Sequence, residues 1–268
     1  MRFGVKPGQW GWDFSELRAS WRAAEEAGFD VLGCFDHVSS SPDGRQAWDG
    51  PSLLTAMAAD TEQIRLAIHV VNASLRNPLL LGGQIAVAQA FSGGRVAVGI
   101  GAGSHYFAKY DHEAAGVAFP AFPERIGRLE TYARILPALW RGEPVTDVAA
   151  GLVDASLGPI GIEPPRLYVG GASDAALEIA ARYADGWHAT GDEERFSERA
   201  HRLDELSAGL DHPTVDKSIQ LRVPTLAGLP DRVSRLREAG ASTVVFVLDA
   251  DQRGPDWVSR LAEAALGR

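Results

Sequence analysis

Asp36 and His37 come directly after the apolar run Val31–Phe35 and are the strongest candidates for chemistry in this sequence. An imidazole changes its protonation state near neutral pH, so a histidine at the end of a strand can take or give a proton during a reaction. The alternative is a buried Asp–His pair that only ties down a loop. We favour His37 as a catalytic acid or base and keep the alternative open.

The run Gly170-Gly171-Ala172-Ser173 is a second candidate, because it joins an apolar stretch to a helix that starts near Asp174. The backbone amides and the dipole of a helix N-terminus bind anions such as phosphate. The same residues also fit a plain tight turn in which Ser173 or Asp174 caps the helix. From these residues alone, both interpretations stay open.

Polar and small side chains follow two further apolar runs. His69, Val70 and Asn72 lie at the end of one run, and Gly101-Ala102-Gly103 follow the next. Glycines at such a place let the backbone approach another group closely. The GxGxxG pattern and the Walker lysine, the two commonest nucleotide-binding signals, are missing. We expect no metal site, because His37, His69 and His188 do not have the spacing of a histidine metal motif.

Short β-rich runs alternate with amphipathic stretches along the whole chain, and this alternation predicts a single (β/α)₈ TIM barrel over residues 1–268. A doubly wound open sheet would need a switch in strand order that a sequence cannot show, so we favour the barrel. Residues 145–165, rich in Gly and Pro, predict a short inserted hairpin between the fourth helix and the fifth strand. The predicted strands are Phe3–Val5, Val31–Phe35, Arg65–Val71, Val96–Ile100, Leu167–Val169, Gly186–Ala189, Ile219–Val223 and Thr243–Leu248.

Composition excludes several classes of protein. The 268 residues are 46% hydrophobic, which is enough for a full core, and the formal charge of −9 argues against a nucleic-acid or anionic-membrane partner. No apolar run is long enough to cross a membrane, and the N-terminus has no signal-peptide pattern. The single cysteine, Cys34, excludes an internal disulfide. We therefore expect a cytoplasmic protein.

Several motifs occur together over more than half of the chain, and as a set they resemble the bacterial luciferase-like monooxygenase superfamily, especially its deazaflavin-dependent members. None of these motifs is specific by itself. The matching stretches are Asp36-His37, Leu53–Thr61 with Ile64–Leu66, Arg76-Asn77-Pro78, Ser92–Arg95 with Gly99–Gly103, Glu124-Arg125 with Leu129-Glu130, Leu139-Trp140, Tyr168–Gly171 and Ala184-Asp185-Gly186.

The resemblance implies a barrel that binds FMN or the deazaflavin coenzyme F-420 over its strand ends. A bulge after the third strand, often with a non-prolyl cis peptide, would fall at His69-Val70 and support the ring of the cofactor. His37 matches the histidine that deazaflavin dehydrogenases use as a catalytic acid or base. The phosphate would lie on Gly170–Ser173, and the expected cofactor-binding residues are Asp36, His69, Val70, Asn72, Gly101, Ala102, Gly103, Gly170, Gly171, Ala172 and Ser173.

Three departures from the family pattern narrow this expectation. Luciferases carry an arginine in the loop after the fourth strand; Ala102 stands there, which favours coenzyme F-420 over FMN or reduced FMN. Deazaflavin sugar-phosphate dehydrogenases carry a catalytic glutamate just after the last glycine of that loop. Ser104 stands in its place, so we do not expect that activity. The short segment between Val223 and Asp231 leaves little room for the mobile lid of many members.

The sequence therefore predicts an oxidoreductase that acts on a small apolar organic substrate. The enzyme would either exchange a hydride with this substrate or oxygenate it. Apolar chemistry is suggested by aromatic residues expected at the rim, namely Trp10, Trp12, Trp48, Tyr106 and Phe107, although these could instead be core or dimer-contact residues. The alternatives are a flavin-binding accessory subunit without turnover, or an unrelated phosphate-binding barrel enzyme. As partners we expect a second copy in a homodimer and a flavin reductase or F-420 reductase that supplies reduced cofactor.

Overall fold

Eight parallel strands close into a barrel in the computed structural model, which describes residues 1–39, 44–103, 106–210, 215–249 and 251–267. The predicted barrel is thereby confirmed, and the order around it follows the sequence. Its strands are β1 (Arg2–Lys6), β2 (Val31–Cys34), β3 (Arg65–Asn72), β4 (Val96–Gly101), β7 (Arg166–Gly170), β8 (Gly186–Thr190), β9 (Asp216–Arg222) and β10 (Thr243–Val247).

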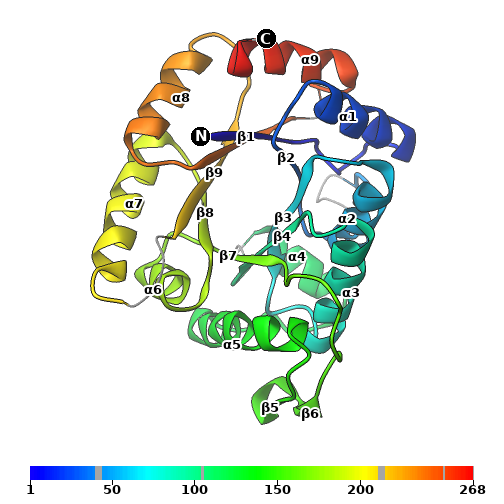
Figure 1. Cartoon of the computed structure of the whole chain (residues 1–268), viewed down its shortest axis with the longest axis vertical. Coiled ribbons are helices and arrows are strands. Elements are labelled where there is room, and N and C mark those ends of the chain that lie inside the picture. Colours follow the sequence, from blue (N-terminus) through cyan, green and yellow to red (C-terminus); the bar gives the residue numbers. More distant parts are fainter. Residues whose placement is uncertain (40–43, 104–105, 211–214, 250, 268) are drawn as a thin grey trace.

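Helices form an outer ring around these strands (Figure 1). One helix follows each barrel strand, as predicted. A further helix that the sequence analysis did not anticipate, α4 (Phe107–Ala114), lies between β4 and the fourth helix of the ring. The ring consists of α1 (Phe14–Glu26), α2 (Gly50–Asp60), α3 (Pro78–Phe91), α5 (Phe122–Trp140), α6 (Asp174–Tyr183), α7 (Glu193–Ser207), α8 (Leu229–Glu238) and α9 (Pro255–Leu266).

The predicted insertion is a two-stranded antiparallel hairpin, made of β5 (Val145–Asp147) and β6 (Leu152–Ala155). A short 3₁₀ turn, η1 (Val148–Ala150), connects its strands. The hairpin projects beyond the ring of helices beside α5 (Figure 1), so it adds no strand to the barrel.

Side-chain caps fix where the helices begin at the carboxyl ends of the strands. Asp13 and Glu16 form a reciprocal capping box at α1, while Asp49 and Asn77 accept hydrogen bonds from first-turn amides of α2 and α3. Behind the caps each helix turns an apolar stripe inward; on α1 this stripe comprises Leu17, Trp21 and Ala24. No helix in the described ranges is both long and apolar enough to span a membrane.

The third strand contains the expected bulge. The register between β3 and β4 shifts between Ile68 and Val71, and the His69-Val70 peptide is cis. The side chain of Val70 lies against β4 and β7, where a Cβ on Gly101 or Gly170 would come within 2.6 Å of it. These glycines therefore make room for Val70, a packing role that the sequence analysis, which assigned them to cofactor binding, did not predict.

The connection after the seventh barrel strand is short, as expected. Residues 223–228 join β9 to α8. A segment of this length cannot fold over the carboxyl end of the barrel as a long lid would.

Candidate functional site

A cavity of about 350 Å³ opens at the carboxyl ends of the barrel strands. Its wall combines aromatic side chains with a few polar groups, which is the usual make-up of a small-molecule site. The lining residues are Trp10, Phe35, Asp36, His37, His69, Val70, Asn72, Gly103, Phe107, Ala108, Asp111, Gly170, Gly171, His188, Thr190, Gln220 and Arg222.

His37 is fixed in the wall of this cavity by Asp111 of α4. The Nδ1 of His37 lies 2.8 Å from Oδ2 of Asp111, and because a carboxylate only accepts, Nδ1–H is the donor. In the neutral ring Nε2 is then the acceptor, and it has no partner among the described residues. Burial alone would raise the pKa of Asp111, but hydrogen bonds from His37 and from the amide of Val38 outweigh it and lower the pKa. Asp111 is therefore an anion that orients His37.

Aromatic rings surround the imidazole. The ring of Trp10 lies 4.3 Å from that of His37, and Trp10 stacks in turn on Phe35 and Phe107 at 5.8 and 5.2 Å. These rings keep bulk water from one side of His37 and make this part of the cavity apolar. Of the other aromatic residues expected at the rim, Trp12 is buried in the core and Tyr106 is exposed outside the lining.

Asp36 does a different job from its neighbour, because its carboxylate points into the protein and meets Arg76. The guanidinium of Arg76 donates to both Asp36 oxygens, through Nε at 3.0 Å and through Nη2, and also to Asp49 at 2.6 Å. The amide of Asn72 donates to Asp36 as well. The Asp36 side chain is only 1% exposed, so the two charges compensate each other out of water.

Below the cavity, the barrel interior is polar. Lys6 is fully buried and donates to the carbonyl of His69 at 2.9 Å and to Gln220 at 2.6 Å. Burial lowers the pKa of Lys6 to about 7. His69 and His188 stack 4.0 Å apart, and burial lowers the pKa of each well below its usual value. Both imidazoles are therefore neutral, and two like charges do not meet in the interior.

The structure of the loop after β7 shows which residue caps α6, one of the two roles that the sequence left open for this loop. Ser173 is the N-cap of α6, and its hydroxyl accepts from the amide of Ala176 at 3.2 Å. Gly171 has φ +135°, a conformation that other residues rarely adopt, and with Gly170 it lines the cavity. Ser173 therefore caps α6. Gly170 and Gly171 leave the backbone at the amino end of α6 accessible to an anion.

The structure brings most of the expected site residues to one cavity. Asp36, His37, His69, Val70, Asn72, Gly103, Gly170 and Gly171 all line it. Gly101, Ala102, Ala172 and Ser173 do not: Gly101 packs under Val70, and Ala172 faces a small cleft against α7. Ser104 and His105, which the sequence places in the same loop, lie outside the described residues.

Asp111 and Gln220 are the site residues that sequence reasoning missed. Asp111 lies on the unanticipated helix α4, next to His112, and both are buried. An acidic residue on the inward side of a short helix, next to the glycine-rich loop, was the signal that could have identified it. Gln220 lies in β9, where alternation predicts an inward side chain but gives no partner for it.

A flat ring system with a phosphate-bearing tail fits the unsatisfied groups of this cavity. The Nδ2 of Asn72 is buried without a hydrogen-bond partner among the described residues, so it can donate to a carbonyl oxygen of a ligand. Val70 offers an apolar surface, and Gly170 and Gly171 offer backbone without side chains. Within the described residues, no three His, Cys, Asp or Glu side chains converge to hold a metal ion.

Comparison with known proteins identifies the family to which this chain is similar. The family model described as luciferase-like monooxygenase matches residues 2–239. Among individual relatives, an F-420-dependent glucose-6-phosphate dehydrogenase of Microbacterium testaceum is 29% identical over 83% of this chain and 68% of the relative. An uncharacterized protein of Mycobacterium tuberculosis is 30% identical over 84% of this chain and 82% of its own length.

A solved structure has a similar fold at low sequence identity. An F-420-dependent secondary alcohol dehydrogenase, in complex with an F-420-acetone adduct, superimposes with a TM-score of 0.79 at 16% identity, over 98% of both chains. This likeness shows the fold alone. The chain spans 56–68% of the length of the first glucose-6-phosphate dehydrogenases that it matches.

The buried pair of Asp36 and Arg76 should dominate the stability of the cavity rim. Arg76→Ala leaves the Asp36 carboxylate buried without its counter-charge, and we expect the free energy of unfolding to fall by about 3–5 kcal/mol. Urea unfolding followed by circular dichroism measures this loss.

Arg18→Ala is the matched control, because Arg18 is half-exposed and its partner Asp60 keeps Arg22. We expect that variant to lose at most about 1 kcal/mol. Equal losses in the two variants would show that the Asp36–Arg76 pair has no special role.

Proposed function

The chain belongs to the luciferase-like monooxygenase family, and from that premise we propose that it is an oxidoreductase using coenzyme F-420 for hydride transfer to or from a small, mainly apolar substrate. It works as a cytoplasmic homodimer. One observation carries the proposal: His37 projects into the cavity with Nδ1 fixed by an anionic Asp111 and Nε2 unpartnered within the described residues.

His37 supplies the proton step of this reaction. When a substrate loses a hydride from carbon, a neighbouring O–H or N–H group also loses its proton, and Nε2 of His37 accepts it. The imidazolium that forms is stabilised by Asp111, whose hydrogen bond keeps the ring in one orientation. In the reverse direction the same Nε2–H returns the proton. Asp111 is a positioning residue, since it acts through His37.

The residues that would hold the cofactor lie on the other side of the cavity. Gly170 and Gly171, with the amino end of α6, would hold its phosphate, while Val70 would support a ring and Asn72 would donate to a ring carbonyl. When bound, a deazaflavin supplies hydride chemistry with little reactivity toward oxygen, because carbon replaces the N5 of a flavin.

Coenzyme F-420 is favoured over FMN for two reasons. Ala102 stands where luciferases carry a phosphate-binding arginine. The relatives named as F-420-dependent dehydrogenases also support this choice. We do not extend their substrate to this chain: Ser104 replaces the glutamate of sugar-phosphate dehydrogenases, and the rings of Trp10, Phe35 and Phe107 favour an apolar molecule. We expect no turnover of glucose 6-phosphate.

An apolar stripe on α3 supports the homodimer. Leu80, Val87 and Phe91 lie on one face of this helix and are 70, 49 and 66% exposed. Large apolar side chains gathered on one face are typical of a surface that another protein covers.

Cofactor choice is the test of the proposal. We expect the purified protein to bind F-420 more tightly than FMN or reduced FMN, as measured by fluorescence titration. Tighter binding of FMN, with no detectable binding of F-420, would replace hydride transfer by flavin chemistry. Failure to bind any of the three would overturn the proposed oxidoreductase function.

The affinity for the cofactor phosphate should depend on Gly171. In Gly171→Val the new Cβ would come within 3.0 Å of the Cβ of Ala176 in the first turn of α6. Because this displaces the backbone that would hold the phosphate, we expect cofactor binding to weaken at least tenfold, about 1.4 kcal/mol. Gly191→Val is the matched control, because Gly191 has a similar φ of +145° but does not line the cavity. An equal effect in both variants would mean that backbone distortion, and not phosphate binding, explains the loss.

Turnover should depend on the His37–Asp111 pair. We expect His37→Ala to lose roughly 10²–10⁴-fold in kcat, the usual contribution of general acid–base catalysis, with much less change in cofactor affinity. Asp111→Asn should lower kcat by less and shift the pH profile of the reaction, because the ring loses its anionic partner.

Melting temperature measured on the same preparations separates catalysis from folding. A stable His37→Ala variant with turnover near that of the wild type would remove His37 from the mechanism. Loss of stability without loss of activity per folded molecule would mean that the pair only ties down a loop.

A further inference from the structure

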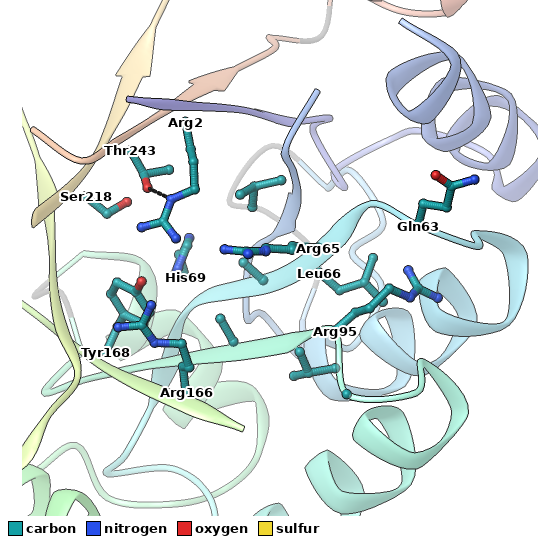
Figure 2. Close-up of a pocket in the computed structure, with 15 residues that line it drawn as sticks. Arg2, Gln63, Arg65, Leu66, His69, Arg95, Arg166, Tyr168, Ser218 and Thr243 are labelled. Carbon is teal, nitrogen blue, oxygen red and sulfur yellow. Dashed lines mark hydrogen bonds between the residues drawn. The ribbon is translucent and has the colours of Figure 1, made fainter. Parts of the chain in front are cut away.

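A second cavity of about 350 Å³ opens at the opposite end of the barrel, where the strands begin. Figure 2 shows its wall, to which β1, β3 and β7 contribute Arg2, Arg65 and Arg166. All residues that line it lie within the described ranges, and none of them is an Asp or Glu. In a chain with a formal charge of −9, this concentration of positive charge is unexpected.

In the part of the chain that the structure describes, Asp216 is the one carboxylate that pairs with these arginines. Asp216 accepts from Nη2 of Arg2 at 2.9 Å and pairs with Nη1 of Arg166 at 2.8 Å. The hydroxyl of Tyr168 donates to the same Asp216 oxygen at 3.1 Å. Arg2 and Arg166 therefore share this carboxylate, and Arg65 pairs with none among the described residues, so three guanidinium charges meet one directly bonded negative charge.

Arg65 is the least constrained of the three. It is exposed at the start of β3 and has no hydrogen-bond or ion-pair partner in the part of the chain that the structure describes. Figure 2 shows its guanidinium directed toward Arg2 and His69. Arg95 lies in the same wall but, unlike Arg65, it is held by the backbone. Its guanidinium donates to the carbonyls of Thr61 and Ile64 near the end of α2.

His69 lines the inner part of this cavity as well as the cavity at the carboxyl ends of the strands, and its ring carries unsatisfied polar atoms. His69 is only 5% exposed, and neither ring nitrogen has a hydrogen-bond partner within the described residues. Buried polar groups without a protein partner are commonly completed by water or a ligand. Because burial lowers the pKa of His69, the ring is neutral and can donate one N–H to an anion.

We propose that this amino-terminal mouth is a binding site for a phosphate dianion, either free or carried by a small organic molecule. The excess of guanidinium charge over bonded carboxylate suits the negative charge of a phosphate group near neutral pH. Planar guanidinium groups suit its oxygens, since each can donate two parallel hydrogen bonds. The cavity is larger than inorganic phosphate and reaches the size at which small organic ligands bind. This site does not depend on the proposed oxidoreductase function.

Calorimetric titration at constant ionic strength tests the site, with inorganic phosphate and glycerol 3-phosphate as probes and chloride as the background anion. We expect saturable binding that weakens at least tenfold in Arg65→Ala. Since Arg65 is exposed and unpartnered, this variant should melt at the wild-type temperature. Arg237→Ala, which removes an exposed arginine from α8, is the matched control and should bind as the wild type does.

Gly171→Val distinguishes this mouth from the glycine loop at the other end of the barrel: the binding that Arg65→Ala weakens should remain in Gly171→Val. Tighter binding of glycerol 3-phosphate than of inorganic phosphate would assign the site to an organic phosphate, and equal binding would assign it to the free ion. The proposal is overturned if neither probe saturates, if Arg65→Ala binds like the wild type, or if Gly171→Val abolishes the binding.

Discussion

The buried carboxylate of Asp36 is the constraint on which the rest of the rim depends. A charge that is almost completely removed from water must be compensated, and Arg76 compensates it while also reaching Asp49 at the start of α2. The same carboxylate accepts from the amide of Asn72 at the end of β3. One ionic contact thus ties together the ends of two strands and the start of a helix, and it fixes the backbone from which His37 projects.

The fixed backbone explains how a side chain with ordinary chemistry acquires a specific role. His37 enters an apolar wall formed by Trp10 and Phe107, and Asp111 holds one ring nitrogen. The other nitrogen is left facing the cavity as the group that can exchange a proton. Asp36 and His37 are neighbours in the chain with separate tasks, one electrostatic and structural, the other directed at a ligand.

The barrel interior links its two ends through one residue. His69 lines both the cavity at the carboxyl ends of the strands and the arginine-rich cavity where they begin. Its carbonyl accepts from the buried Lys6, and its ring stacks on His188. Because Val70 follows directly and needs the glycine surface of β4 and β7, little freedom remains for this segment.

The sequence by itself determined the barrel, the hairpin after α5 and the candidacy of His37, because alternating periodicity and residue placement at strand ends are local signals. The bulge at His69-Val70 was expected only from the resemblance to a known family. The sequence could not determine that Gly101 packs under Val70, or that Ser173 caps α6 while Gly171 lines the cavity. Only the tertiary structure decided that Asp111 holds His37. These two residues are 74 positions apart, and contacts at such separation leave no periodic trace in a single chain. The convergence of Arg2, Arg65 and Arg166 follows from barrel closure for the same reason.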